Sequence, residues 1–466
     1  MPVNNKRLSL VLILAITALL AGMSFTLLSC APSQPAVEVE LQGALIIPSQ
    51  EEEIRLRAYR PEVELVLTWE GEESGSAAVV VENIAADSTE VKAAPAAGEE
   101  AASCTVKKES PTVLRLTVNG SGTQRVELKP TPVVDDKPLL FAVVGDSQGR
   151  NEVLAKIIEE VNSSKADFLI CLGDLVASGS GKEYQVSQET MAALNCPYYT
   201  VPGNHDVKGE GSVYYCQNLS PEYYYFDYSG FRFCFLDSSS MGIDAEQLAW
   251  LEETLAEGEL PGYLFLHVPP VDPRGKDHGF LDPNQAQAFI ELVTASNSPV
   301  QGVFSGHIHL FNQSQTSGVQ FVVSGGGGAP LYASADQGGY HHFALCRSTS
   351  EGLKVEPVKV KAPPRPEELV ITGTEGDLIF SRDELDAMAV LKEELCFQNQ
   401  LGNFAGKGVY RGVPVMELLE KAGGMEPGDA LMVYALDGYS QAFAYENVYP
   451  ESCGWAERQG EMALAV

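Results

Sequence analysis

Five short polar motifs, each placed directly after an apolar run, constrain this chain more than any other feature. Gly145-Asp146 follows the apolar run 139–144, and Gly173-Asp174 follows the run 168–172. Three histidine motifs follow later runs: Gly203-Asn204-His205-Asp206, His267-Val268-Pro269-Pro270 and Gly306-His307-Ile308-His309. In open α/β sheets, ligands gather beyond the carboxyl ends of the strands, so we expect these side chains to meet at one rim. Together they form the oxygen and nitrogen ligand set of a metal-dependent hydrolase.

Each motif alone also has a common structural explanation. A Gly-Asp pair after a strand is often a turn, and a single buried histidine is more often structural than a ligand. The ordered set of five motifs is what predicts metal chemistry. His307 and His309, two positions apart on a predicted extended segment, are expected to point to the same side.

The ordered motifs resemble those of the calcineurin-like metallophosphoesterases, which run D-x-H, GD, GNH-D/E, H and G-H-x-H, over about residues 138–360. The resemblance implies a two-layer β-sandwich flanked by helices, with two divalent metal ions such as Mn, Fe or Zn at the strand ends. It implies that a metal-bridging hydroxide attacks a phosphate ester while His205 acts as the general acid. It also implies seven metal ligands: Asp146, Gln148 and His309 for the first ion, Asn204, His267 and His307 for the second, and Asp174 bridging both.

The chain departs from related patterns at two positions. Gln148 stands where the family has its first histidine, and a neutral amide oxygen is a weaker ligand than imidazole. Purple acid phosphatases, which also carry an N-terminal β-sandwich, have a tyrosine where this chain has Ala177. We therefore expect no tyrosinate-iron centre.

The N-terminal segment has the pattern of an export signal. Lys6-Arg7 precedes the uncharged apolar run 8–28, which ends in Leu27-Leu28-Ser29-Cys30. These last residues resemble the lipobox of bacterial lipoproteins, which implies that residues 1–30 are a signal peptide and that Cys30 is lipidated. The alternative is a retained membrane anchor helix. Both interpretations place the protein on the extracytoplasmic face of the cell membrane.

The net charge of −32 argues against nucleic-acid binding, because a polyanion repels phosphate backbones. The eight cysteines after Cys30 form no Cys-x-x-Cys pair or zinc-like cluster. Export permits disulfides, but the sequence does not establish any pairing. The sequence leaves open the oligomeric state, the metal, and the choice between a phosphate monoester and a diester.

Three folded segments follow the signal in this multidomain chain. Alternating apolar residues over 37–134 predict an all-β sandwich, with a hairpin turn at 119–122. Apolar runs alternating with helical patterns over 138–360 predict the α/β domain, including helices over 245–256 and 284–295. Within it, the glycines 325–328 either present N–H groups to a phosphate or form a tight connection. The neighbouring pair His341-His342 either contributes a polar wall or, as we interpret it, is structural with its hydrogen bonds satisfied.

Residues 366–466 form a predicted α+β domain. The segments 408–424 and 437–440 resemble the molybdopterin-binding domain of sulfite-oxidase-type oxidoreductases. That family uses a cysteine thiolate on molybdenum, and Cys396 is the nearby cysteine. Because its neighbours lack basic and glycine residues, we interpret Cys396 as a buried thiol and expect no bound molybdopterin. The final apolar run 462–466 indicates a strand of an incomplete domain.

The sequence therefore predicts an exported, membrane-tethered, metal-dependent phosphoesterase. Two alternatives stay open: a non-catalytic surface binding protein on the same fold, and a molybdenum oxidoreductase with an accessory phosphoesterase domain.

Overall fold

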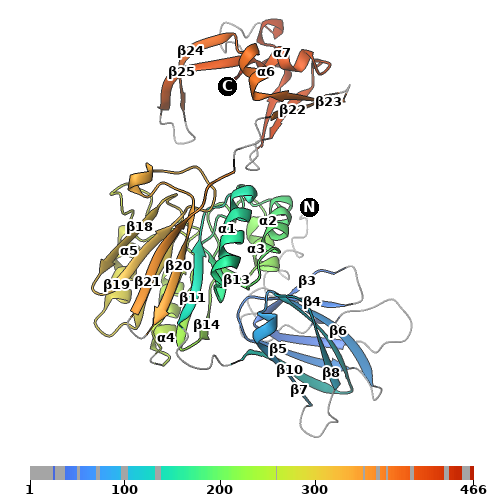
Figure 1. Cartoon of the computed structure of the whole chain (residues 1–466), viewed down its shortest axis with the longest axis vertical. Coiled ribbons are helices and arrows are strands. Elements are labelled where there is room, and N and C mark those ends of the chain that lie inside the picture. The colour runs from blue at the N-terminus through green and yellow to red at the C-terminus, as the bar shows by residue number, and fades with distance from the viewer. Residues whose placement is uncertain are drawn as a thin grey trace, which may run out of the picture. The chain divides into compact units, whose positions relative to one another are not determined.

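The chain divides into two compact units, residues 1–362 and 363–466 (Figure 1). The computed structural model describes residues 25–26, 37–49, 53–69, 74–95, 103–131, 138–258, 260–349, 352–363, 368–373, 376–398, 404–434, 440–453 and 462–465. No helix within these ranges is long and apolar enough to cross a membrane. The predicted signal peptide lies almost entirely outside them.

The first part of unit 1 consists of two five-stranded sheets that share one hydrophobic core. Along its strands, buried residues alternate with more exposed ones, because one face of each sheet packs inward and the other faces solvent. In β5 (Val63–Trp69), for example, every second residue is buried. One sheet has the order β1 (Phe25–Thr26), β2 (Val37–Gln42), β5 (Val63–Trp69), β10 (Thr123–Pro130), β7 (Thr89–Pro95). The other has the order β3 (Ala44–Ile47), β4 (Ile54–Ala58), β6 (Gly75–Glu82), β9 (Val113–Gly120), β8 (Ser103–Ser110).

The hairpin predicted at residues 119–122 is wrong. Strands β9 and β10 flank this turn, but β9 pairs with β6 and β8, whereas β10 pairs with β5 and β7. The turn therefore connects the two sheets rather than two neighbours in one sheet. Gly122, at φ 60°, adopts the left-handed conformation that this connection needs.

The second part of unit 1 consists of two sheets packed face to face, with helices on both outer faces, as predicted (Figure 1). The first sheet has the order β13 (Tyr198–Thr200), β12 (Phe168–Cys171), β11 (Leu139–Val144), β20 (His342–Thr349), β21 (Gly352–Lys359). The second has the order β14 (Tyr224–Tyr228), β15 (Phe231–Phe235), β16 (Gly262–Leu266), β17 (Val300–Ser305), β19 (Val319–Ser324), β18 (Phe311–Thr316).

Both faces of the central strands are covered, which explains why their sequences are uninterrupted apolar runs. In β11, Phe141 and Val143 face the aromatic layer between the two sheets, whereas Ala142 and Val144 face the helices. Helices α1 (Asn151–Ser164), α2 (Gly181–Met191) and α3 (Gly211–Asn218) cover the first sheet. Helices α4 (Ala245–Ala256) and α5 (Pro283–Thr294) cover the second sheet and match the two predicted helices.

The N-terminal sandwich contacts strand β13, at the free edge of the first sheet of the second part. The side-chain amide of Asn83 donates to the carbonyl oxygen of Tyr198 at 2.8 Å and accepts from the main-chain N–H of Tyr198 at 2.8 Å. This pair of bonds replaces the partner strand that edge strand β13 lacks. Since β13 leads directly into residues 203–206, the sandwich supports the strand that carries part of the candidate site.

Unit 2 is a small α+β unit in the residues that the structure describes there. Its core includes Leu385, Val413 and Leu418, contributed by two helices and a strand. Strand β28 pairs with the end of β25. The elements are β22 (Glu368–Gly373), β23 (Gly376–Ser381), α6 (Arg382–Met388), β24 (Leu391–Gln398), β25 (Phe404–Pro414), α7 (Val415–Glu420), β26 (Ala430–Tyr434), β27 (Ser440–Ala444), α8 (Tyr445–Val448) and β28 (Ala463–Ala465).

Candidate metal centre

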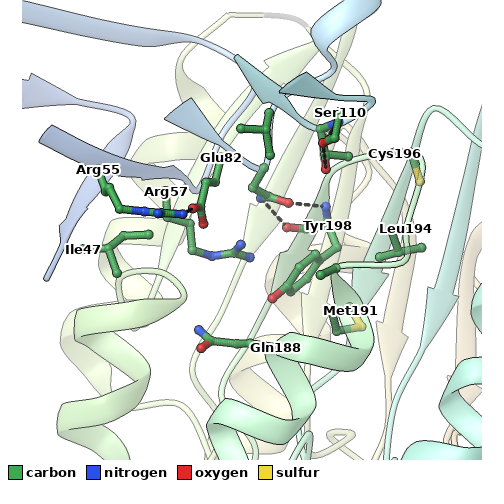
Figure 2. A pocket seen from close by; sticks show the side chains of 14 residues that line it. Ile47, Arg55, Arg57, Glu82, Ser110, Gln188, Met191, Leu194, Cys196 and Tyr198 are labelled. Atoms are coloured by element: carbon green, nitrogen blue, oxygen red, sulfur yellow. Dashed lines mark hydrogen bonds and ion pairs between the residues drawn. The ribbon is translucent and has the colours of Figure 1, made fainter. Parts of the chain in front are cut away.

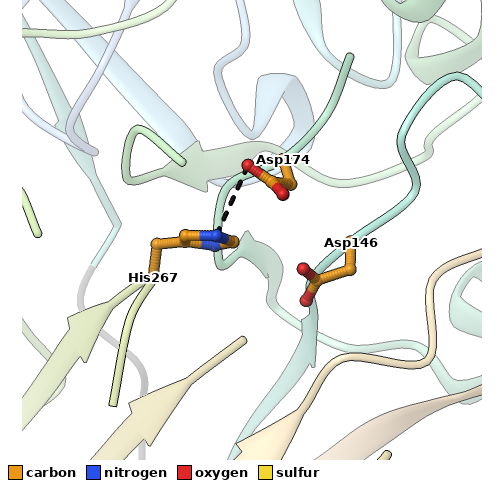
Figure 3. A group of neighbouring side chains, drawn as sticks. All are labelled: Asp146, Asp174 and His267. Atoms are coloured by element: carbon orange, nitrogen blue, oxygen red, sulfur yellow. Dashed lines mark ion pairs between the residues drawn. The ribbon is translucent and has the colours of Figure 1, made fainter. Parts of the chain in front are cut away.

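The predicted ligands meet at one rim of the two sheets, where the parallel strands end. Asp146 follows β11, Asp174 follows β12, His267 follows β16 and His307 follows β17. Ligand atoms of Asp146, Asp174 and His267 all lie within 4.8 Å of one another, and all three residues are buried. Figure 3 shows the two carboxylates and the imidazole turned toward a common point.

The backbone at this rim holds rarely used conformations. Asp146, Gln148, Asp174 and His307 have φ values of 65°, 43°, 52° and 63°, in the left-handed region. Each such residue costs free energy, on the order of 1–3 kcal/mol, and persists only where the surrounding structure imposes it. Residues of this kind cluster at functional sites. Here all four belong to the predicted ligand set.

Two glycines allow the ligand loops to approach closely. A Cβ atom on Gly203 would lie 2.2 Å from the Oδ1 atom of Asp174, and one on Gly306 would lie 2.6 Å from the Oδ2 atom of Asp146. Any side chain at these positions would therefore push a carboxylate out of place.

The two buried carboxylates have no lysine or arginine partner among the residues that the structure describes. Asp146 forms its ion pair with His309 at 3.4 Å, and Asp174 forms its ion pair with His267 at 3.4 Å. Buried charges in proteins are normally paired or coordinate metal ions. Two adjacent carboxylates surrounded by imidazoles and amides therefore fit a site for divalent cations.

Asp174 is the most connected side chain of the centre. Its Oδ1 accepts the main-chain N–H of His205 at 2.8 Å, and its Oδ2 accepts Nε2 of Gln148 at 2.9 Å. Burial raises the pKa of this carboxyl, but His267, His205 and the two hydrogen bonds outweigh burial and lower the pKa overall. Asp174 is thus held in the charged form that binds metal.

On one side of Asp174, His267, Asn204 and His307 converge. Nε2 of His267 lies 3.0 Å from Oδ1 of Asn204 and 3.3 Å from Nδ1 of His307. Nδ1 of His267 lies 2.7 Å from the carbonyl oxygen of Leu172, which fixes the tautomer and leaves Nε2 as the free donor atom. Burial and the neighbouring His267 together lower the pKa of His307 to about 3, so this imidazole is neutral and able to bind a cation.

On the other side, His309 and Gln148 lie against Asp146. Nε2 of His309 lies 3.5 Å from Nε2 of Gln148, and its Nδ1 lies 2.6 Å from the carbonyl oxygen of Pro330. The segment 306–310 is not extended as predicted, because it bends at His307, whose main-chain N–H donates to Asp146. Beyond the bend, His307 lies against His267, whereas His309 lies against Asp146 and Gln148.

His205 lies at the edge of the centre with its ring held by the main chain. Its Nδ1 lies 2.6 Å from the carbonyl oxygen of Ala177, and Nζ of Lys208 lies 2.8 Å from the same nitrogen. Asp206 does not contact the imidazole. Instead, its carboxylate accepts the main-chain N–H groups of Gly203 at 2.9 Å and Val176 at 3.1 Å, and this joins the two ligand loops.

Sequence reasoning missed a group of side chains beside His307 and His309. The ring of Tyr332 stacks on His309 with centroids 4.1 Å apart, and the ring of His278 lies 6.1 Å from that of His307. The guanidinium of Arg274 lies 5.4 Å from the Tyr332 ring and pairs with Asp272. These residues lie in irregular loops whose sequences carry no motif, so only the position of His278 shortly after His267 offered a signal.

The glycines 325–328 form a tight connection rather than an open phosphate cradle. The N–H groups of Gly325 and Gly327 donate to the carbonyl oxygens of Leu310 and Gly145. A Cβ atom on Gly327 would lie 2.4 Å from that Gly145 oxygen. Next to this loop, His342 is fully buried, with Nδ1 2.8 Å from the carbonyl oxygen of Tyr340. Its Nε2 has no hydrogen-bond partner among the described residues, so His342 is not the fully satisfied structural histidine that was predicted.

Two further predictions stay untested. Cys30 lies outside the described residues. Cys396 lies in β24, among residues whose side chains the structure does not describe, so the resemblance of unit 2 to a molybdopterin-binding domain stays a prediction. The cysteines whose side chains the structure describes are free thiols: Cys104, Cys171, Cys196, Cys216, Cys234 and Cys346.

Comparison with known proteins matches residues 139–311 to the family model described as calcineurin-like phosphoesterase. Glycerophosphodiester phosphodiesterase GpdQ of Enterobacter lignolyticus is 31% identical over 180 residues, which cover 34% of this chain and 63% of that protein. A probable cyclic nucleotide phosphodiesterase of Fibrobacter succinogenes is 30% identical over 150 residues, which cover 31% of this chain and 57% of that protein. The 3′,5′-cyclic adenosine monophosphate phosphodiesterase CpdA of Escherichia coli K12 is 32% identical over 152 residues, which cover 31% of this chain and 54% of that protein. The chain thus spans less than two thirds of each of these relatives.

Proposed function

Because residues 139–311 match the family model of the calcineurin-like phosphoesterases, we propose that this chain is a metal-dependent phosphodiesterase, exported and tethered to the cell membrane. The observation that carries the enzymatic part is the pair of buried carboxylates, Asp146 and Asp174, whose ion pairs are with histidines. The choice of a diester is supported by three relatives that are named as phosphodiesterases.

The residues of the centre divide into two groups around Asp174. We assign one divalent ion to Asp146, Gln148 and His309, a second to Asn204, His267 and His307, and Asp174 to both. Two such ions, when bound, would supply positive charge to the phosphoryl oxygens and would make water a stronger nucleophile near neutral pH. The chain itself contributes fixed imidazole orientations, through the carbonyl oxygens that hold Nδ1 of His267 and His309.

His205 is the residue that we assign to the leaving group. Its Nδ1 is occupied by the carbonyl oxygen of Ala177 at 2.6 Å and by Nζ of Lys208 at 2.8 Å, so Nε2 is the ring nitrogen left to face a substrate. In the protonated ring, Nε2 donates its proton to the departing alkoxide. No side chain needs to form a covalent bond to phosphorus.

The direct test compares bis(p-nitrophenyl) phosphate with p-nitrophenyl phosphate on the purified chain, with metal content measured on the same sample. We expect faster hydrolysis of the diester. Asp174→Asn removes the charge shared by both ions with little change in shape, and we expect it to lose metal and activity together. Hydrolysis of neither ester by metal-loaded protein would favour the alternative of a non-catalytic binding protein.

The cellular location is proposed from the sequence 27–30, Leu-Leu-Ser-Cys, at the end of an apolar run. Cys30 is the proposed lipidation site. The wild-type chain is expected in the membrane fraction and to incorporate labelled fatty acid. Cys30→Ser should incorporate none, whereas Cys104→Ser, at a half-buried thiol, serves as the matched control. Equal labelling of both variants would contradict lipidation at Cys30.

A further inference from the structure

A pocket of about 430 Å³ lies where the N-terminal sandwich meets the phosphoesterase domain, away from the metal centre. Its volume falls in the range of small-molecule sites, roughly 300–1,000 Å³. Figure 2 shows strands of the sandwich above it and helix α2 below it. From the sandwich, the lining includes Ile47, Arg55, Arg57, Glu82, Ser110 and Thr112; from the phosphoesterase domain, it includes Gln188, Met191, Leu194, Cys196 and Tyr198.

Arg57 is a buried cation in this pocket, with only 6% of its surface exposed. Its Nε donates to the carbonyl oxygen of Leu219 at 3.3 Å, and its guanidinium lies 4.2 Å from the centre of the Tyr198 ring. Among the described residues, no carboxylate forms an ion pair with Arg57, whose guanidinium also lies within hydrogen-bonding reach of the Tyr198 side chain. In Figure 2 the guanidinium extends into the space between Tyr198 and Gln188.

The other charged side chains that line the pocket, Arg55 and Glu82, neutralise each other. Arg55 forms ion pairs with Glu82, which also lines the pocket, and with Glu53, which does not, so Arg57 is the lining charge without an ion-pair partner among the described residues. Ser110, Thr112 and Gln188 add neutral hydrogen-bonding groups.

We propose that this pocket binds a small organic oxyanion, a carboxylate or a phosphate, through the terminal nitrogens of Arg57. A buried guanidinium without an anion carries a desolvation cost that an oxyanion offsets. The fork of two N–H groups matches both carboxylate and phosphate oxygens. The apolar wall formed by Ile47, Met191 and Leu194 accommodates a nonpolar part of the same ligand. The site is independent of the proposed hydrolysis, because none of its residues belongs to the metal centre.

The test uses two glutamine variants on helix α2. Gln188 lines the pocket, whereas Gln185 is exposed outside it and bonds to Glu189. Gln188→Glu places a carboxylate beside Arg57, and Gln185→Glu adds the same charge elsewhere on the helix. Each full-length, metal-loaded variant is titrated calorimetrically with inorganic phosphate and, separately, with benzoate. Both variants retain the metal centre, so anion binding at the metal centre contributes equally to both titrations. The difference in anion affinity between the two variants therefore measures binding in the pocket.

We expect Gln185→Glu to bind at least one of the two anions as the wild type does, and Gln188→Glu to bind that anion at least about tenfold more weakly. Binding of phosphate alone or of benzoate alone identifies which oxyanion class the pocket prefers. Identical titrations of the two variants with both anions would overturn the proposal. Arg57→Gln should weaken binding as well, but it also removes the contacts to Leu219 and Tyr198, so Gln188→Glu is the deciding variant.

Discussion

The main-chain N–H of His205 donates a 2.8 Å hydrogen bond to Oδ1 of Asp174. This bond joins the proposed proton donor to the carboxylate proposed to bridge both metal ions. Because the donor is a main-chain group, the bond is independent of the imidazole. The role of the ring can therefore be tested without removing the loop from the metal centre.

His205→Ala should retain wild-type metal content, because its main-chain bond to Asp174 remains. Turnover of an alkyl phosphodiester should fall by about two to four orders of magnitude, the usual contribution of a general acid. The loss should be much smaller for bis(p-nitrophenyl) phosphate, since nitrophenolate departs without protonation. Equal losses for both substrates would argue against a general-acid role.

Gln148 should make the first metal site the weaker one. Its amide lies 2.9 Å from Oδ2 of Asp174 and 3.5 Å from Nε2 of His309, and a half-turn of the amide presents its oxygen instead of its nitrogen. An amide oxygen is a poorer donor to transition metals than imidazole. Metal withdrawal should therefore show two phases, and Gln148→His should tighten the weaker one. Unchanged phases would remove Gln148 from the ligand set.

Tyr332 should orient His309, because their rings stack with centroids 4.1 Å apart. Tyr332→Ala removes this support and should reduce metal affinity or activity by about tenfold, a typical effect of residues that position ligands. Tyr332→Phe keeps the stacked ring and should behave as the wild type. If phenylalanine is as harmful as alanine, the hydroxyl rather than the stacking is what matters.

His342 should make stability depend on pH. Burial lowers the pKa of His342 from 6.5 to about 4, so between these values the unfolded chain binds a proton that the folded chain excludes. Stability is therefore lost as pH falls from 6.5 toward 4, by up to about 1.4 kcal/mol per pH unit. His342→Asn, which cannot titrate, should lose stability less steeply in urea unfolding experiments over this range. Parallel profiles for the two proteins would contradict this assignment.

Elements whose sequence signals lie within the element itself could be predicted from the sequence. The run 139–144 gave β11 with its bounds, and the cap Asp244 with Gln247 gave helix α4. The convergence of Asp146, Asp174 and His267 could also be predicted, because parallel strands end at the same rim.

Nonlocal features could not be predicted in this way. The turn 119–122 has hairpin residues, but the sheet that each flanking strand joins depends on partners far away in the chain. Tyr332 stacks on His309 from an irregular loop, and the sequence of such a loop has no helical or strand periodicity from which its path could be predicted. At the bend, the main-chain N–H of His307 donates a hydrogen bond to the carboxylate of Asp146, a contact between residues 161 positions apart.

Removal and return of metal tests the central claim most directly. The purified chain is treated with a chelator until metal analysis finds none, assayed with a phosphodiester, and assayed again after divalent metal is restored. The buried pair Asp146 and Asp174 predicts that activity disappears with the metal and returns as about two ions per chain rebind. Undiminished hydrolysis by the metal-free protein would contradict it.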